Sequence, residues 1–216
     1  PDAVLLVAPS DHVILDEAKF HAAVNLGLSE VKSRNIVTFG ITPDRPETGY
    51  GYLELASIAN HNPVKLKRFV EKPDLNTAED MLASKNYLWN SGIFIFRAID
   101  ILTAFEMYIP NLLAPVKSAI ENGKPDLGFF RLDPAAWAEC HDISIDYAVM
   151  EHADNLVAVP LSAGWSDLGD WNAVWKEQGP DNKGIVATQN VTEIDCHNVL
   201  LRSESDNQHL VGLGLN

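Results

Sequence analysis

Apolar residues occur along this chain in two patterns, short continuous runs and runs with helical spacing. Continuous apolar runs are typical of strands buried on both faces of a sheet. They cover residues 4–8, 35–41, 93–96 and 156–161. Two further strands are expected at residues 50–55 and 65–70, the second with one solvent-facing side because charged and apolar residues are mixed in it.

Between these runs, helical spacing predicts helices. The first begins at Asp16 or Glu17 and places Phe20, Val24, Leu28 and Val31 on one face. Others are expected at residues 76–85 (capped by Asn76 or Thr77), 99–108, 111–121, 144–151 and 171–177. Strands that alternate with helices indicate an α/β fold, and we expect the first strand, helix and strand to have a right-handed crossover.

The dipeptide Glu71-Lys72 follows the strand at residues 65–70, which Pro73 ends because proline cannot donate to a ladder. A carboxylate can accept hydrogen bonds from adjacent sugar hydroxyls, and a lysine ammonium is a compact charge suited to a phosphate. The dipeptide therefore offers both halves of a sugar-phosphate site. An isolated Glu-Lys pair is, however, more often a solvated strand end.

Short polar residues precede the apolar run at residues 93–96: Asn90, Ser91 and Gly92 leave an open backbone that a ligand could approach, although such a run is usually a turn. Gly51, near the start of another strand, would also allow close approach, and a bulge or turn glycine is the alternative.

Asp11 and Asp167 each follow an apolar strand. If those strands are parallel, both carboxylates lie at one side of the sheet, where one or two carboxylates with substrate phosphates can hold magnesium. Either aspartate alone is more often a turn residue. Asp146 is a third candidate, although its position in the first turn of a helix favours a purely structural role.

The composition narrows the class of ligand. The chain has 216 residues and a net charge of -14, from 16 basic and 30 acidic residues, which tells against binding to nucleic acid or to an anionic membrane surface. An anionic ligand would need local help from a lysine, a helix N-terminus or a divalent cation. Two cysteines give no disulfide framework, and no apolar run approaches membrane-spanning length, so we expect a cytoplasmic protein.

After Gly184 the pattern changes to short apolar pairs separated by Asn, Asp and Ser, which indicates a small β-coil or hairpins. We therefore expect an α/β domain at residues 1–178 and a short-strand β segment at residues 179–216. The chain opens directly on a buried-type strand and stops without a terminating element. We expect it to be a piece of a longer protein.

Six motifs carry a resemblance to a known family. They are Ala8-Pro9-Ser10-Asp11-His12, Thr48-Gly49-Tyr50-Gly51-Tyr52, Phe69-Val70-Glu71-Lys72-Pro73, Trp89-Asn90-Ser91-Gly92-Ile93-Phe94, Ser144-Ile145-Asp146-Tyr147-Ala148-Val149-Met150-Glu151 and Trp165-Ser166-Asp167-Leu168-Gly169. In these, the chain resembles the bacterial mannose-1-phosphate guanylyltransferases, or GDP-mannose pyrophosphorylases, of the long form related to the bifunctional enzymes with a phosphomannose isomerase domain. Each motif alone is weak, but six in the family's order are a strong signal.

The resemblance implies a Rossmann-like nucleotide-diphospho-sugar transferase fold, incomplete at the N-terminus, and the reaction of GTP with mannose 1-phosphate to give GDP-mannose and pyrophosphate. It further implies that Asp11 and Asp167 hold Mg²⁺. The chemistry is an in-line attack by the sugar phosphate, which needs alignment and charge neutralisation from the protein.

By motif position, Gly51, Glu71 and Asn90 would contact the mannose, and Lys72 would neutralise its phosphate and act with the two aspartates in catalysis. Asp146 would be a further residue on the sugar side. Two other functions stay open: transfer to another sugar 1-phosphate or nucleotide, and a non-catalytic subunit that senses sugar nucleotides.

One departure from the family is large. Its Gly-rich loop, which ends in Arg and Lys and cradles the triphosphate, has no match before Asp11. Loss of the opening strand and helix should also leave an exposed sheet edge and apolar surface around residues 4–7, so we expect self-association into a homo-oligomer.

The first prediction is that residues 1–216 alone give no detectable GDP-mannose and at most weak, magnesium-dependent binding of mannose 1-phosphate. In a body with a net charge of -14, the triphosphate needs the amides and basic side chains of the absent loop. The measurement is pyrophosphate release, with light scattering on the same sample. Robust turnover by a monodisperse monomer would contradict it.

Overall fold

The computed structural model describes residues 2–58 and 62–216. The chain separates into two compact units, one of residues 1–9 and 16–163 and the other of residues 10–15 and 164–216. The division predicted at residue 178 remains a prediction. No helix in the described ranges is long and apolar enough to cross a bilayer.

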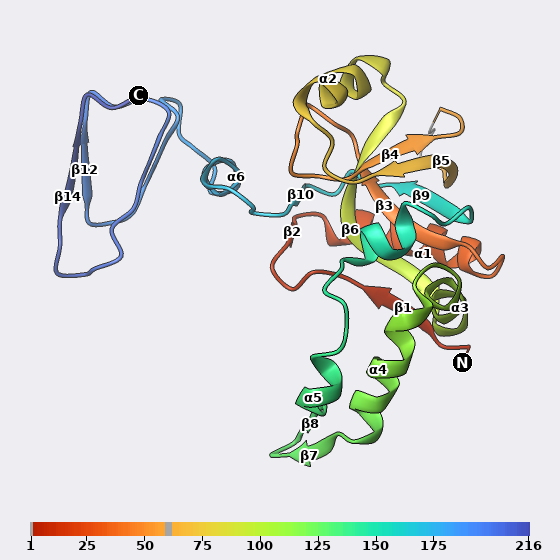
Figure 1. Cartoon of the computed structure of the whole chain (residues 1–216). Helices are drawn as coiled ribbons and strands as arrows, with labels where there is room; N and C mark the ends of the chain where they lie inside the picture. The colour runs from red at the N-terminus through yellow and green to blue at the C-terminus, as the bar shows by residue number, and fades with distance from the viewer. Residues whose placement is uncertain (1, 59–61) are drawn as a thin grey trace. The chain divides into compact units, whose positions relative to one another are not determined.

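The first unit is built on a six-stranded mixed sheet (Figure 1). Its strands, in spatial order, are β1 (Val4–Val7), β6 (Tyr87–Arg97), β3 (Ile36–Ile41), β9 (Leu156–Pro160), β5 (Val64–Val70) and β4 (Tyr52–Leu55). Strand β4 also pairs with the start of β6, so β6 has β3 and β4 as neighbours at its beginning and β3 and β1 farther on.

The helices of this unit are α1 (Glu17–Val31), α2 (Leu75–Ser84), α3 (Ala98–Tyr108), α4 (Pro110–Glu121), the short α5 (Pro134–Trp137) and the π-helical turn η1 (Asp146–Met150). Helices α3 and α4 lead away from the sheet to a small hairpin of β7 (Lys124–Asp126) and β8 (Phe129–Arg131) (Figure 1). The expected α/β fold is confirmed.

Strand directions follow from the ladders. Strand β6 is antiparallel to both β1 and β3, and β3 is parallel to β9. Strands β1, β3 and β9 therefore run in the same direction. This confirms the prediction that the strands preceding Asp11 and Asp167 are parallel.

The two faces of the sheet carry different cores. Leu53 pairs with Leu88 and lies in a cluster with residues of α3 and η1, whereas Tyr52 pairs with Trp89 and packs beneath Ala78 and other residues of α2. Because side chains alternate across a strand, successive residues of β4 and β6 face opposite cores. This alternation places the site residues on one face and their chain neighbours on the other.

Three expectations were wrong, two about where elements begin and one about burial. Asn90, Ser91 and Gly92 lie inside β6 rather than in a turn before it, because Asn90 pairs with Gly40 of β3 and Gly92, at φ 71°, accommodates the irregular backbone that follows. Helix α2 begins at Leu75, since the side chain of Asp74 accepts the hydrogen bond from the backbone N of Thr77 at 2.9 Å.

The third correction concerns β1, which the continuous apolar run predicts as buried on both faces. Its four residues are 40–48% exposed because β1 is an edge strand of the sheet. The exposed apolar edge expected at residues 4–7 is thus confirmed.

The second unit consists of short elements. β2 (Val13–Ile14) pairs antiparallel with β10 (Trp165–Ser166), and α6 (Trp171–Glu177) follows with Asp170 as its cap. The strands β11 (Ile185–Ala187) and β13 (Val199–Leu201) are parallel, as are β12 (Val191–Ile194) and β14 (Leu210–Leu213). Parallel pairing between strands so close in sequence indicates a coil rather than hairpins.

The second prediction concerns Gly40 in the central strand β3. A Cβ at this position would lie 2.5 Å from Leu88 Cδ1 and 2.8 Å from Leu88 Cβ, so Gly40→Ala should lower the free energy of unfolding by about 1–3 kcal/mol through overpacking. Urea denaturation measures this. Gly49→Ala is the control, because the one heavy atom near a Cβ at this position is the side-chain atom Glu47 Oε1, at 3.3 Å. Equal losses in both variants would contradict the packing argument.

Candidate functional site

Glu71 turns its carboxylate inward directly after β5. Its side chain is only 8% exposed, and a Cβ at Gly51 would lie 2.6 Å from Glu71 Oε2. Gly51 therefore leaves the space that this carboxylate uses. The close approach of a ligand predicted at Gly51 stays a prediction, and in the structure the group closest to this position is the Glu71 side chain.

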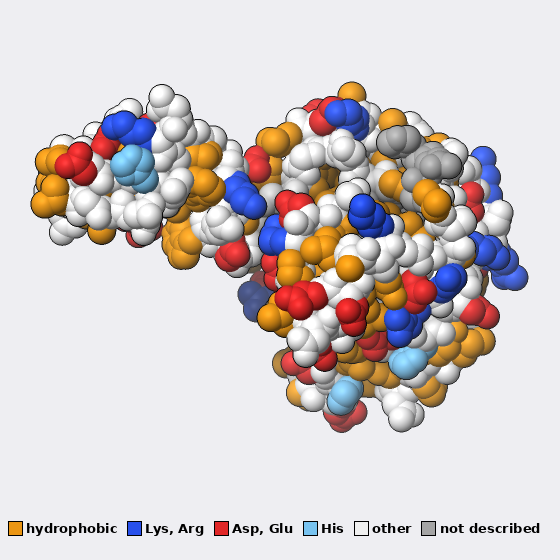
Figure 2. Space-filling view, turned by 90° about the horizontal axis from the view of Figure 1, so that it is seen from above, with side chains coloured by type: hydrophobic (Ala, Val, Ile, Leu, Met, Phe, Trp, Pro, Cys, Tyr) orange, Lys and Arg blue, Asp and Glu red, His pale blue; other side chains and the backbone are white. Residues whose placement is uncertain are grey.

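Lys72 takes the opposite direction. Its backbone has φ 46°, in the left-handed region, and its side chain is 57% exposed. Lys72 Nζ lies 3.6 Å from Glu71 Oε1. The dipeptide thus presents an enclosed acceptor and a solvent-facing cation side by side. On the face of the molecule seen in Figure 2, Lys and Arg side chains lie among Asp and Glu side chains.

Asn90 connects the parts of the site. Its side-chain oxygen accepts hydrogen bonds from Thr38 Oγ1 at 2.8 Å and from the Gly92 backbone N at 3.2 Å, and its Nδ2 donates to Asp146 Oδ1 at 3.2 Å. Its backbone N donates to the Gly51 carbonyl at 2.7 Å. Since the Gly92 N–H can only donate, the amide oxygen must face it, which directs the amide nitrogen toward Asp146.

Burial and neighbouring acids raise the pKa values of two carboxyl groups in this region, Glu71 and Asp146. Burial, then the nearby charge of Asp146, raises the pKa of Glu71, and Lys72 opposes the shift. Burial also raises the pKa of Asp146, against the lowering effects of its backbone, Lys72 and Asn90. Glu151 adds a further negative charge and accepts a hydrogen bond from the Glu71 backbone N at 3.0 Å. The site therefore favours ligand groups that donate hydrogen bonds or carry positive charge.

Five predicted residues of the first unit are joined by these contacts: Gly51, Glu71, Lys72, Asn90 and Asp146. Asp146 lies in the first turn of η1 and accepts a hydrogen bond from Asn90, and its role as a site residue stays a prediction. Sequence reasoning missed Thr38 and Glu151. The available signals were a single threonine, now 1% exposed, inside an apolar strand, and the last acid of the motif that contains Asp146.

Asp11 and Asp167 belong to the second unit. The pairing of Val13 with Ser166 in the β2–β10 ladder brings the segments that carry them to one end of that ladder, and Trp165 Nε1 donates to His12 Nδ1 at 3.2 Å beside it. Two carboxylates suit Mg²⁺ when phosphate and water oxygens complete its shell. Within residues 2–58 and 62–216, no three His, Cys, Asp or Glu side chains form a group arranged for a metal.

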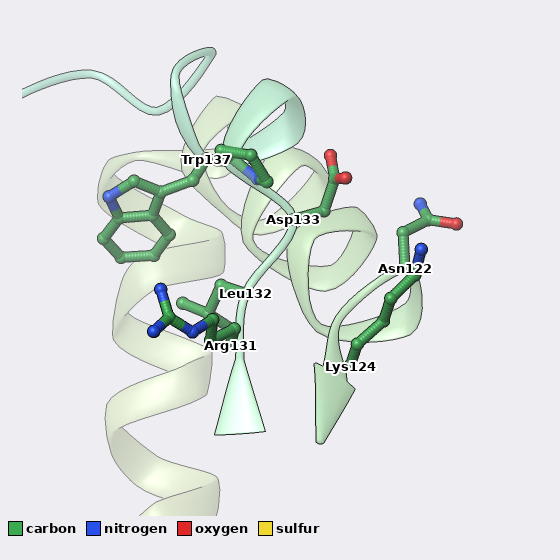
Figure 3. A pocket seen from close by; sticks show the side chains of 7 residues that line it. Asn122, Lys124, Arg131, Leu132, Asp133 and Trp137 are labelled. Carbon is green, nitrogen blue, oxygen red and sulfur yellow. The ribbon is translucent and has the colours of Figure 1, made fainter. Parts of the chain in front are cut away.

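A cavity of about 570 Å³ lies elsewhere in the first unit, near the end of α4, the β7–β8 hairpin and α5. Figure 3 shows the indole of Trp137 near Arg131, and Lys124 beside Asn122. None of the residues that line it is among the predicted sugar-phosphate residues. Its size alone assigns it no function.

Comparison with known sequences gives consistent matches. The family model described as nucleotidyl transferase matches residues 1–183. The xanthan biosynthesis protein XanB of Xanthomonas campestris pv. campestris (strain B100) is 46% identical over 197 residues, 91% of this chain and 42% of that protein. The mannose-1-phosphate guanylyltransferase of Escherichia coli K12 is 38% identical over 213 residues, 97% of this chain and 43% of that protein. The chain thus spans less than half the length of these relatives.

Solved structures also match. One described as a mannose-1-phosphate geranyltransferase from Thermus thermophilus has a TM-score of 0.82 at 27% identity, over 98% of this chain and 60% of that one. One described as a mannose-6-phosphate isomerase from Helicobacter pylori has a TM-score of 0.69 at 32% identity, and the match covers 76% of this chain and 63% of that one. These likenesses confirm the expected nucleotidyltransferase fold.

The third prediction follows from the raised pKa of Asp146. Between the unfolded and folded pKa values the folded state binds more protons, so this group's contribution to stability falls as the pH rises above the ordinary carboxyl range. Asp146→Asn keeps an acceptor for Asn90 without the charge. It should therefore increase the free energy of unfolding at pH 7 relative to that at pH 4, measured by urea denaturation.

Asp74→Asn is the matched control of opposite sign. Hydrogen bonds from Thr77 lower the pKa of Asp74, so its contribution is present above its unfolded pKa and is lost as the pH falls through its folded pKa. This variant should decrease the difference between the free energies of unfolding at pH 7 and at pH 3, because that window extends below the ordinary carboxyl pKa of 3.8. Changes in the same direction for both variants would show that burial of Asp146 does not control its protonation.

Proposed function

Because the chain belongs to the nucleotidyl transferase family, we propose that the protein that contains it forms GDP-mannose and pyrophosphate from GTP and mannose 1-phosphate. Relatives named for this activity, each spanning more than twice the length of the match, support the reaction. The structural observation that carries the proposal is the enclosed Glu71 carboxylate between Gly51 and the Asn90–Asp146 pair.

Glu71 is proposed as the main sugar contact. An inward carboxylate of raised pKa gains most from hydroxyl groups that donate to its charged form, and adjacent sugar hydroxyls supply two such donors. The Gly51 backbone and the Asn90 amide complete the sugar contacts, and Asp146 orients Asn90. These assignments use the same residues that the family motifs indicate.

Lys72 is proposed to bind the phosphate of mannose 1-phosphate. Its exposed ammonium lies next to the sugar acceptor, so one ligand can reach both groups. A nucleophilic phosphate oxygen then attacks the α-phosphorus of GTP while the bond between the α-phosphorus and its bridging oxygen breaks and pyrophosphate leaves. The contribution of Lys72 is alignment and charge neutralisation.

Asp11 and Asp167 are proposed to hold a divalent cation, Mg²⁺, and count with Lys72 as the catalytic groups. Their position at one end of the β2–β10 ladder and their oxygen donors fit a hard cation. Such an ion, when bound, neutralises phosphate charge at the reacting centre. The protein is further proposed to act in the cytoplasm as a homo-oligomer without nucleic-acid or membrane partners.

Two alternatives keep the same site. A sugar other than mannose could use a carboxylate and an amide in the same way, and a panel of sugar 1-phosphates and nucleoside triphosphates with the full-length protein discriminates among them. A non-catalytic subunit that senses sugar nucleotides would bind such ligands without releasing pyrophosphate. The complete open reading frame, read for a Gly-rich loop before Asp11, discriminates this case.

The fourth prediction separates binding from turnover in the full-length protein. Glu71→Ala should raise KM for mannose 1-phosphate about 10- to 100-fold with little change in kcat, since it removes charge-assisted hydrogen bonds to the ground-state sugar. Asp167→Ala should lower kcat by about 100-fold or more, since it removes charge stabilisation at the reacting phosphates. Steady-state kinetics of pyrophosphate release measure both.

Glu79→Ala, an exposed acid on α2, is the control and should leave both parameters unchanged. If the Glu71 and Asp167 variants showed the same rise in KM and the same fall in kcat, this division of roles would be wrong. Absence of pyrophosphate release by the unmodified protein, with mannose 1-phosphate still bound, would favour the sensing subunit.

A further inference from the structure

A single arginine covers two aromatic rings behind the proposed sugar site. Arg45 lies in the loop between β3 and β4, and its guanidinium carbon is 5.0 Å from the ring centre of Trp89 and 6.0 Å from that of Tyr50. The two rings meet edge to face, with their centres 5.3 Å apart. A cation above aromatic faces at this range is attracted by their quadrupoles.

Acidic neighbours hold the guanidinium in place. Arg45 Nη1 lies 3.1 Å from Asp44 Oδ1, and its Nη2 and Nε lie 3.1 and 3.2 Å from Glu47 Oε2. Glu47 is itself fixed, because its Oε1 accepts from the Gly49 backbone N at 3.0 Å and its backbone N donates to the Tyr52 hydroxyl oxygen at 2.9 Å. The loop is therefore tied to the buried start of β4 through Arg45 and Glu47.

The two rings directly precede two site residues. Tyr50 precedes Gly51, and Trp89 precedes Asn90; the Asn90 backbone N donates to the Gly51 carbonyl at 2.7 Å. Since side chains alternate across a strand, Trp89 and Asn90 point to opposite faces of β6. A displacement of either ring would move the backbone on which the sugar contacts depend.

Trp89 has no polar anchor of its own. It is 4% exposed, and among the described residues its indole N–H has no hydrogen-bond partner. Its orientation is therefore set by packing, including the edge contact with Tyr50 and the guanidinium of Arg45. A planar guanidinium can stack on the ring and hold two carboxylates at once, which a lysine ammonium cannot do equally well.

We propose that Arg45 is a positioning residue for the sugar-phosphate site, which acts through Tyr50 and Trp89 to fix the spacing of Gly51, Glu71 and Asn90. This inference rests on the proposed function, because the ligand it concerns is mannose 1-phosphate. Arg45 makes no contact with the reacting phosphates in this role. Its loss should affect sugar-phosphate binding and leave the chemical step intact.

The fifth prediction is that Arg45→Gln in the full-length protein raises KM for mannose 1-phosphate about three- to tenfold, the range that corresponds to loss of a partly desolvated cation–π contact. The kcat and the KM for GTP should stay within about twofold, because the site for the chemical step is unchanged. Arg45→Lys keeps a cation over the rings without the planar fork. It should give an intermediate KM.

Arg68→Gln is the matched control. Arg68 also pairs with a glutamate near β4, through Nε to Glu54 Oε2 at 3.2 Å, and its Nη2 donates to the Tyr87 hydroxyl oxygen at 3.0 Å. It therefore tests the loss of an arginine–glutamate pair between β5 and β4, with Tyr87 of β6 as its aromatic neighbour. KM for mannose 1-phosphate should stay at the unmodified value in this variant.

A purely structural role would instead lower kcat through a reduced folded fraction and leave KM unchanged. An unchanged KM for mannose 1-phosphate in Arg45→Gln would overturn the inference. A rise of KM in Arg68→Gln equal to that in Arg45→Gln would also overturn it. If the unmodified protein releases no pyrophosphate, the proposed function fails, and calorimetric titration with mannose 1-phosphate decides the inference by the same three- to tenfold weakening. Absence of binding by the unmodified protein would overturn both.

Discussion

The arrangement of the site depends on one side-chain amide. Asn90 uses its oxygen for Thr38 and Gly92 and its nitrogen for Asp146, while its backbone N binds Gly51. These partners come from β3, from β6 itself, from η1 and from the segment before β4. Because a half-buried amide that loses one partner is left with a poorly satisfied group, the four segments can adopt only a small range of relative positions.

The sheet makes this possible by giving β6 a different neighbour at each end. Its first residues pair with β4 and β3, and its later residues pair with β3 and β1. Because side chains alternate along β6, its two faces have different neighbours. Asn90 faces the polar cluster, and Trp89 faces the aromatic residues that Arg45 covers. The polar face can hold ligand-binding groups because the opposite face supplies the apolar packing that fixes the strand.

Local sequence rules recovered most of the fold. Continuous apolar runs located β3 and β9, and helical spacing located α1, which begins at Glu17, one of the two starts expected, with Asp16 as its cap. The errors arose where pairing between distant segments overrides local preference. Residues 90–92 have the composition of a turn but lie inside β6, because Asn90 pairs with Gly40 of β3 and Phe94 pairs with Thr38. The apolar β1 is exposed because its position at the sheet edge is a property of topology. Thr38 escaped notice for the same reason, since its partner is 52 positions away.

The effect of a charged pair also depends on its surroundings in the fold and cannot be derived from the local sequence. From the sequence, Glu71-Lys72 is a neutral pair that could be a solvated strand end, and a net charge of -14 disfavours an anionic ligand. In the structure the two side chains differ in their exposed fraction, which is 8% for Glu71 and 57% for Lys72. An enclosed acid of raised pKa discriminates among neutral donors such as hydroxyls, whereas an exposed lysine attracts phosphate. In the proposed function, the two charges of this dipeptide act on different parts of a sugar phosphate, so a chain that is acidic overall can still bind that ligand.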